Sequence, residues 1–226
     1  MDPTLSPTVQ DYLKIIYDLR AAGREASTSQ LAARLGIAPA SVTGMLQRLA
    51  GKKLPLVNYR KHQGVSLTRR GEQAALEVIR HHRLLEEYLV RTLGYSWDSV
   101  HAEADRLEHV LSEDMEARID ALLDHPRRDP HGEPIPTPEL VLPEDASVPL
   151  ADLRPPQEAV IRRVDSREAD LLRQLQALGL VPGARFRLLV FSPGDPVARL
   201  RLEGPEAAEV TIPAEVTRKV FVETIP

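Results

Sequence analysis

The chain has 226 residues and a net charge of −4 at neutral pH, and its length fits two or three small domains. It contains no cysteine, which excludes disulfides, thiolate zinc sites and iron–sulfur clusters. No apolar run reaches membrane-spanning length and the N-terminus lacks a signal-peptide pattern, so we expect a cytoplasmic protein with no membrane partner.

Charge is distributed unevenly along the chain. Residues 1–75 carry 11 Lys and Arg against five Asp and Glu, whereas residues 76–125 carry five against 12. A basic module followed by an acidic one is typical of a nucleic-acid-binding domain joined to a cation-binding domain.

The first 75 residues have the pattern of a helix-turn-helix followed by a wing. Helices are predicted over residues 8–20, 27–36 and 41–51, and the alternating segment 56–68 predicts a two-stranded wing. Small and polar side chains on the third helix suit contact with base edges and phosphates, and basic residues in the wing suit phosphates. The candidate DNA-binding residues are Ser41, Thr43, Gln47, Arg48, Arg60 and Lys61. A helical pair with a hairpin and no nucleic-acid role is the alternative.

Two amphipathic helices are predicted next, over residues 69–91 and 96–123, with a turn at Gly94. Their apolar positions exceed what one helix pair can bury, so we expect a self-association surface and a homodimer. A two-fold dimer presents two recognition helices to the two half-sites of a palindromic operator in double-stranded DNA.

Carboxylates and imidazoles gather on these two helices at spacings of three and four residues. Such groups on one helical face can hold a first-row divalent metal ion. The members are His82 and Glu86 on the first helix, and His101, Asp105, Glu108 and His109 on the second. The alternative is an ordinary solvated acidic face. Asp11, near the start of the first predicted helix, has the usual alternative role of complementing the helix dipole.

The remaining third of the chain has two parts. Residues 126–153 are rich in proline and predict a linker rather than a packed element. His131 within it and His125 directly before it are expected to lie at the surface. Residues 154–226 contain several short strand patterns and one helix pattern, which predict a small β-barrel.

Three ordered motifs carry a resemblance to a known family. HRLLE at 82–86, VHAEADRLEHVLS at 100–112 and DPHGEPIP at 129–136 resemble the diphtheria toxin repressor and manganese transport regulator family of metal-dependent transcription regulators. LGLVPGARFRLL and PGDPV resemble the SH3-like domain also found in ferrous-iron transport A-type proteins. The resemblance covers nearly the whole chain. It implies a mainly α fold with a small β part: an N-terminal winged helix-turn-helix, a helical dimerisation domain and a C-terminal SH3-like β-barrel.

The resemblance also implies two metal sites. The primary, activating site would be formed by Asp11, Asp105, Glu108 and His109. The ancillary site would be formed by His82, Glu86 and His101, with Asp165 and Glu168 from the SH3-like domain. The manganese branch has a second Glu on the first helix where this chain has Lys14, so a paired manganese-type site is not expected.

The expected function is that of a metal-activated repressor, not an enzyme, that binds palindromic operator DNA and represses metal-uptake genes. A donor set of carboxylates with one imidazole favours Mn(II) first and Fe(II) second, and Zn(II), Co(II) or Ni(II) would also bind in vitro. We expect the ion to join the first helix to the acidic helix and so to set the spacing of the recognition helices.

Three alternatives stay open at this point. The first is a metal-independent winged-helix regulator or small-ligand sensor. The second is a metal-dependent hydrolase, although the sequence has neither an HExxH motif nor a Gly-rich phosphate loop. The third is a barrel that binds a Pro-rich peptide such as the chain's own linker.

Overall fold

The structure is a computed structural model that describes residues 5–51, 53–60, 63–165, 168–192, 194–204 and 208–225. It divides into two compact units. The N-terminal unit consists of Met1–His82, Leu107–Arg118 and Pro136–Leu142, and the C-terminal unit consists of Arg83–Arg106, Ile119–Ile135 and Pro143–Pro226. The unit boundaries at 82/83, 106/107 and 118/119 fall inside helices.

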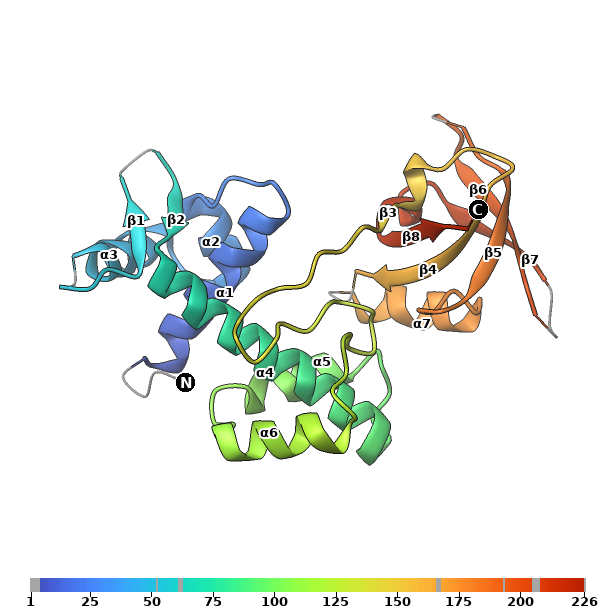
Figure 1. Cartoon of the computed structure of the whole chain (residues 1–226). Coiled ribbons are helices and arrows are strands. Elements are labelled where there is room, and N and C mark those ends of the chain that lie inside the picture. The colour runs from blue at the N-terminus through green and yellow to red at the C-terminus, as the bar shows by residue number, and fades with distance from the viewer. Residues whose placement is uncertain are drawn as a thin grey trace. The chain divides into compact units, whose positions relative to one another are not determined.

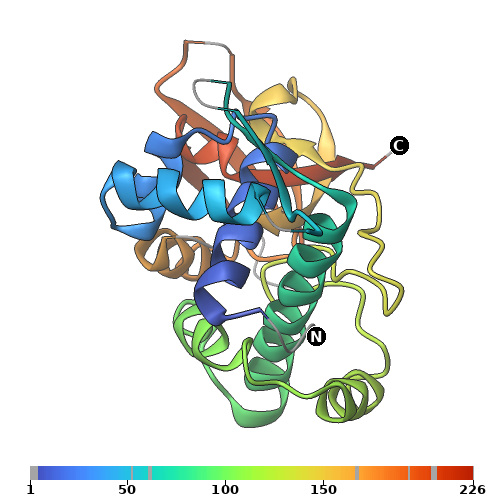
Figure 2. The same cartoon turned by 90° about the vertical axis from the view of Figure 1, so that its left-hand side faces the viewer.

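The N-terminal unit starts with a winged helix-turn-helix (Figures 1 and 2). Its elements are α1 (Pro7–Ala21), α2 (Thr28–Leu35), α3 (Pro39–Ala50) and the antiparallel strands β1 (Val57–Tyr59) and β2 (Val65–Leu67). Ser27 caps α2 by accepting a hydrogen bond from the Gln30 amide, and Gly36 ends the helix in the left-handed conformation. Apolar residues one helical turn apart on α1 and α3 build the core, among them Tyr12, Leu13, Ile16, Val42, Leu46 and Leu49.

The acidic region contains three helices where two were predicted. The first is α4 (Arg69–Leu93), and the second predicted helix is split into α5 (Val100–Leu107) and α6 (Glu113–Leu122). The expectation of one helix over residues 96–123 is therefore wrong. Ser112 explains the split, because its hydroxyl accepts a hydrogen bond from the Met115 amide at 3.3 Å and so caps a new helix whose first turn is acidic.

The C-terminal unit contains a six-stranded antiparallel sheet in the order β3-β8-β4-β5-β6-β7. The strands are β3 (Val148–Pro149), β4 (Glu158–Val164), β5 (Arg185–Val190), β6 (Val197–Leu202), β7 (Glu209–Pro213) and β8 (Val220–Thr224), with α7 (Ala169–Ala177) after β4. Alternate strand residues point into one core together with three leucines of α7. Trp97, in the α4–α5 connection, belongs to the same core.

The segment that follows α6 is packed, which differs from the linker expected there. The Val164 amide donates a hydrogen bond to the His131 carbonyl at 2.9 Å, so the segment lies against β4. Gly132 has φ of +87°, and a Cβ atom there would lie 1.9 Å from the Arg162 carbonyl oxygen. His131 is fully buried, so the expectation of a surface histidine is wrong for it, whereas the His125 side chain is 73% exposed as expected.

No helix in the described part of the chain is both long enough and apolar enough to cross a membrane.

Candidate metal centres and recognition helix

The first cluster joins α1 to the turn after α5, within the N-terminal unit. Asp11 Oδ1 lies 2.9 Å from His109 Nε2, which lies 3.6 Å from Glu108 Oε1. A cation with bonds of about 2.1 Å has octahedral ligands about 3 Å apart, so this donor set fits a divalent ion. Three of the four residues predicted for the primary site are thus brought together.

His109 is held by a residue that the sequence did not single out. Its Nδ1 lies 2.7 Å from Oε1 of Gln10, and Gln10 is buried. When Nδ1–H donates to this amide oxygen, the lone pair of Nε2 faces Asp11 and Glu108. Metal-binding histidines are commonly oriented through their second nitrogen in this way.

The two carboxyl groups of this cluster have different environments. Burial raises the pKa of Asp11, and the negative charge of Glu108 raises it further, against the lowering effect of His109. Burial also acts to raise the pKa of Glu108, but hydrogen bonding from His82 and the charge of Lys14 hold that pKa below its usual range. Glu108 is therefore a buried carboxylate that remains charged at neutral pH.

Lys14 enters the same region from α1. Its Nζ donates to Glu108 Oε2 at 2.7 Å and lies 3.1 Å from His82 Nδ1. The side chain of Glu108 is only 2% exposed and that of Lys14 16%. The pair is thus largely shielded from water.

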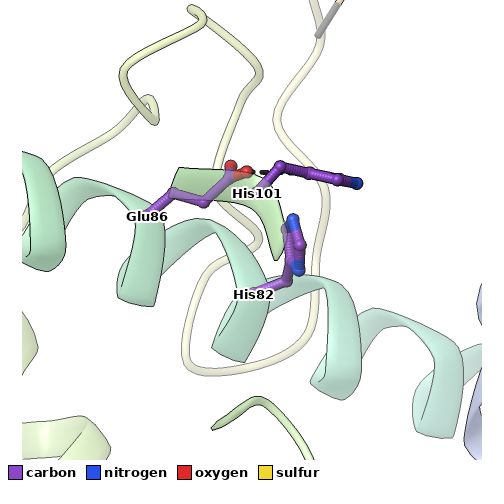
Figure 3. Close-up of side chains that lie close together, drawn as sticks. All are labelled: His82, Glu86 and His101. Atoms are coloured by element: carbon purple, nitrogen blue, oxygen red, sulfur yellow. Dashed lines mark hydrogen bonds and ion pairs between the residues drawn. The ribbon is translucent and has the colours of Figure 1, made fainter. Parts of the chain in front are cut away.

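The second cluster centres on Glu86 of α4. Figure 3 shows His82 and Glu86 one turn apart on α4, and a dashed line joins Glu86 to His101 of α5. His101 Nδ1 lies 3.0 Å from Glu86 Oε1. The three residues expected to share an ancillary site therefore do converge.

Two buried residues on another side of Glu86 extend this cluster, and the sequence analysis did not assign them. His131 Nδ1 lies 3.6 Å from Glu86 Oε2 and has no hydrogen-bond partner among the described residues, while His131 Nε2 lies 2.6 Å from the Trp97 carbonyl. Burial acts to lower the pKa of His131, yet Glu86 and Asp129 raise it to about 9. Burial and the Glu86 charge raise the pKa of Asp129 to about 8. The sequence feature that could have identified Asp129 and His131 as candidate ligands is their Asp-Pro-His spacing within the motif DPHGEPIP.

The structure separates three predicted ligands from these sets. Asp105 is not grouped with Asp11 and His109; its carboxylate lies 3.6 Å from His101 Nε2, and it groups with His82 and Glu108. The single helical face expected for these residues is interrupted by the turn after Leu107. Among the described residues, Asp165 and Glu168 join none of the ligand groups, and Glu168 pairs with Lys219 at 2.6 Å.

The recognition helix presents the predicted polar surface. Ser41, Gln47 and Arg48 are exposed on α3, and Thr43 is partly exposed, with its hydroxyl donating to the Pro39 carbonyl. Arg60 is exposed just after β1, and Lys61 lies outside the described residues.

Comparison with known proteins places these features in one family. Residues 4–65 match the family described as the iron dependent repressor, N-terminal DNA binding domain, and residues 68–137 match its metal binding and dimerisation domain. Residues 148–224 match the FeoA domain.

Relatives and solved structures extend over the whole chain. The iron-dependent repressor IdeR of Mycobacterium leprae is 34% identical over 233 residues, which cover 98% of this chain and 99% of the relative. A structure described as a manganese-dependent transcriptional repressor complex with manganese has 33% identity and a TM-score of 0.89, covering 96% of this chain and 100% of the other. ScaR with bound Zn²⁺ has 30% identity and a TM-score of 0.79, covering 96% and 99%. The chain therefore belongs to the iron-dependent repressor family of metal-activated, DNA-binding transcriptional repressors.

Proposed function

We propose that this repressor responds to Mn(II), with Fe(II) as the second choice, and binds a palindromic operator as a homodimer to repress metal-uptake genes. The observation that carries the proposal is the convergence of Asp11, from the first helix of the DNA-binding part, with Glu108 and His109.

The physical role of these residues follows from their charges. Asp11 and Glu108 repel each other across a partly buried site, and this repulsion opposes the approach of α1 to the turn after α5. A divalent cation bound there supplies two positive charges that cancel the repulsion. Asp11 then holds α1, which packs on α2 and β2, so the whole recognition unit is held with it. A tenfold gain in DNA affinity requires about 1.4 kcal/mol of such coupling.

The proposed order of metal ions rests on the donor atoms. Two carboxylates and one imidazole favour harder ions, so Mn(II) comes before Fe(II), and Zn(II), Co(II) or Ni(II) bind in vitro because raw affinity follows the Irving–Williams order. The names of the relatives agree with a family that uses both metals, since IdeR is described as iron-dependent and the similar structure as manganese-dependent.

An ancillary ion is proposed at Glu86. His82 and His101 offer donors to it on one side, and the buried Asp129 and His131 on another. These last two replace Asp165 and Glu168 as the favoured additional ligands.

The test is retention of operator DNA, with and without Mn(II) or Fe(II) under anaerobic conditions. Glu108→Ala and His109→Ala should each weaken metal-dependent retention at least tenfold, whereas Asp114→Ala, which removes an exposed carboxylate paired with Arg118, should behave as the wild type. Metal-activated binding that survives Glu108→Ala would contradict the site, and binding insensitive to a chelator would contradict metal activation itself.

A further inference from the structure

The Lys14 ammonium lies beside two candidate metal ligands, Glu108 of the first cluster and His82 of α4. It contacts Glu108 Oε2 at 2.7 Å and lies 3.1 Å from His82 Nδ1, and these two ligand atoms are 2.5 Å apart. Lys14, His82 and Glu108 all lie within the N-terminal unit. A carboxylate oxygen and an imidazole nitrogen are atoms that a divalent metal ion takes as ligands, and a positive charge already lies within 3.1 Å of both.

The burial of these atoms explains why a cation is needed there. Glu108 has a side chain that is 2% exposed, and His82 has one that is 6% exposed. A buried carboxylate without a compensating charge or hydrogen bond is costly, so the hydrogen bond from His82 and the charge of Lys14 both stabilise Glu108 on this side. Lysine supplies a compact point charge with three donors on a flexible stem.

We propose that the Lys14 ammonium is a tethered cation that occupies the second cation position of the cluster. The position formed by His82 and Glu108 then takes no metal ion in the wild-type protein. The metal response is left to the neighbouring set of Asp11, Glu108 and His109. Lys14 thus determines how many ions the cluster holds. This inference rests on the proposed metal binding at that neighbouring set.

The variants that test it remove the charge of Lys14. Lys14→Met keeps most of the stem, and Lys14→Gln keeps a hydrogen-bond donor for Glu108, so the second carries the test if the first does not fold. After equilibrium dialysis against Mn(II), elemental analysis of each purified full-length protein should show one more ion per chain than the wild type. Lys14→Arg keeps the charge and should match the wild type.

Two controls locate the additional ion. Arg34→Met removes a surface charge paired with Asp18 in the same unit, and its metal content should equal that of the wild type. The double variant Lys14→Met with His82→Ala should hold the same number of ions as His82→Ala alone, because the new position has lost its imidazole.

The outcomes separate the inference from the function on which it rests. A wild-type content of Mn(II) that is unchanged in Lys14→Met and Lys14→Gln would overturn the inference and leave the proposed function standing. If the wild-type protein binds no Mn(II), so that Glu108→Ala and His109→Ala have no bound ion to lose, the inference and the proposed function are both overturned. An extra ion that persists in the double variant relative to His82→Ala would also overturn the inference.

Discussion

Two histidines of the clusters are each held by a hydrogen bond at one ring nitrogen. His109 uses Nδ1 towards the Gln10 amide oxygen, and His131 uses Nε2 towards the Trp97 carbonyl. When Nδ1 of His109 donates, its Nε2 is left as a potential acceptor that faces Asp11. The pKa of His131, raised to about 9, instead leaves a proton on both of its nitrogens at neutral pH. A neutral imidazole with a fixed tautomer is the form that binds a metal ion, so the hydrogen bond to Gln10 prepares His109 before the ion arrives.

Replacement of Gln10 tests this preparation. Gln10→Leu removes the acceptor for His109 Nδ1 and should lower Mn(II) affinity by about 10- to 100-fold while the fold is retained. Isothermal titration of the full-length protein with Mn(II) measures the change. Gln10→Glu keeps an acceptor at the same place and should retain most of the affinity. Equal affinities in the leucine variant and the wild type would show that the ring needs no such support.

At the scale of elements, two non-helical segments position the ligands. The turn between α5 and α6 places Glu108 and His109, and it exists because Ser112 starts a new helix. The segment around Gly132 places Asp129 and His131 beside β4, within the C-terminal unit. Its close contact with the Arg162 carbonyl leaves no room for a side chain.

Gly132→Ala should destabilise the C-terminal unit strongly. The new Cβ atom would lie 1.9 Å from the Arg162 carbonyl oxygen, and φ of +87° adds backbone strain, for a loss of about 3 kcal/mol or more in the free energy of unfolding. Gly183→Ala is the matched control, because Gly183 has φ of +91° but no atom within 4 Å of an added Cβ, and about 1 kcal/mol is expected. Urea unfolding followed by circular dichroism measures both, and similar losses would argue against the packing of this segment.

At the scale of the whole molecule, the exposed apolar residues of α6 suit the proposed contact between two chains. Met115 and Leu122 stand two turns apart on α6 and are 49% and 65% exposed. Large exposed apolar side chains on one helical face are typical of an interaction surface. Residues 68–137, which contain α6, match a metal binding and dimerisation domain.

Leu122→Glu should convert the dimer to a monomer. A carboxylate would replace an exposed apolar side chain that we expect at the contact between two chains, so operator retention should fall by at least tenfold while Mn(II) binding is kept. Light scattering after gel filtration measures the mass, and a gel shift measures DNA binding. Val141→Glu, at another exposed apolar position that is 59% exposed, should stay dimeric. A dimeric Leu122→Glu protein would place the interface elsewhere.

The sequence by itself determined the elements whose signals are local. The caps at Ser27 and Gly36, the period of apolar residues on α1 and α3 and the alternation around β1 and β2 each depend on neighbours along the chain. The residue types of Glu108 and His109 likewise predicted metal-binding chemistry, whereas Asp11 entered the predicted site through the family resemblance.

Only the tertiary structure decided which side chains meet. Gln10 reaches His109 across 99 positions of the chain, and Lys14 reaches Glu108 across 94. His131 was expected at the surface because its proline-rich neighbours resemble a linker, yet backbone pairing with β4 buries it. Contacts between residues so far apart depend on packing and on the satisfaction of buried polar groups, and no periodicity or spacing along the chain encodes them.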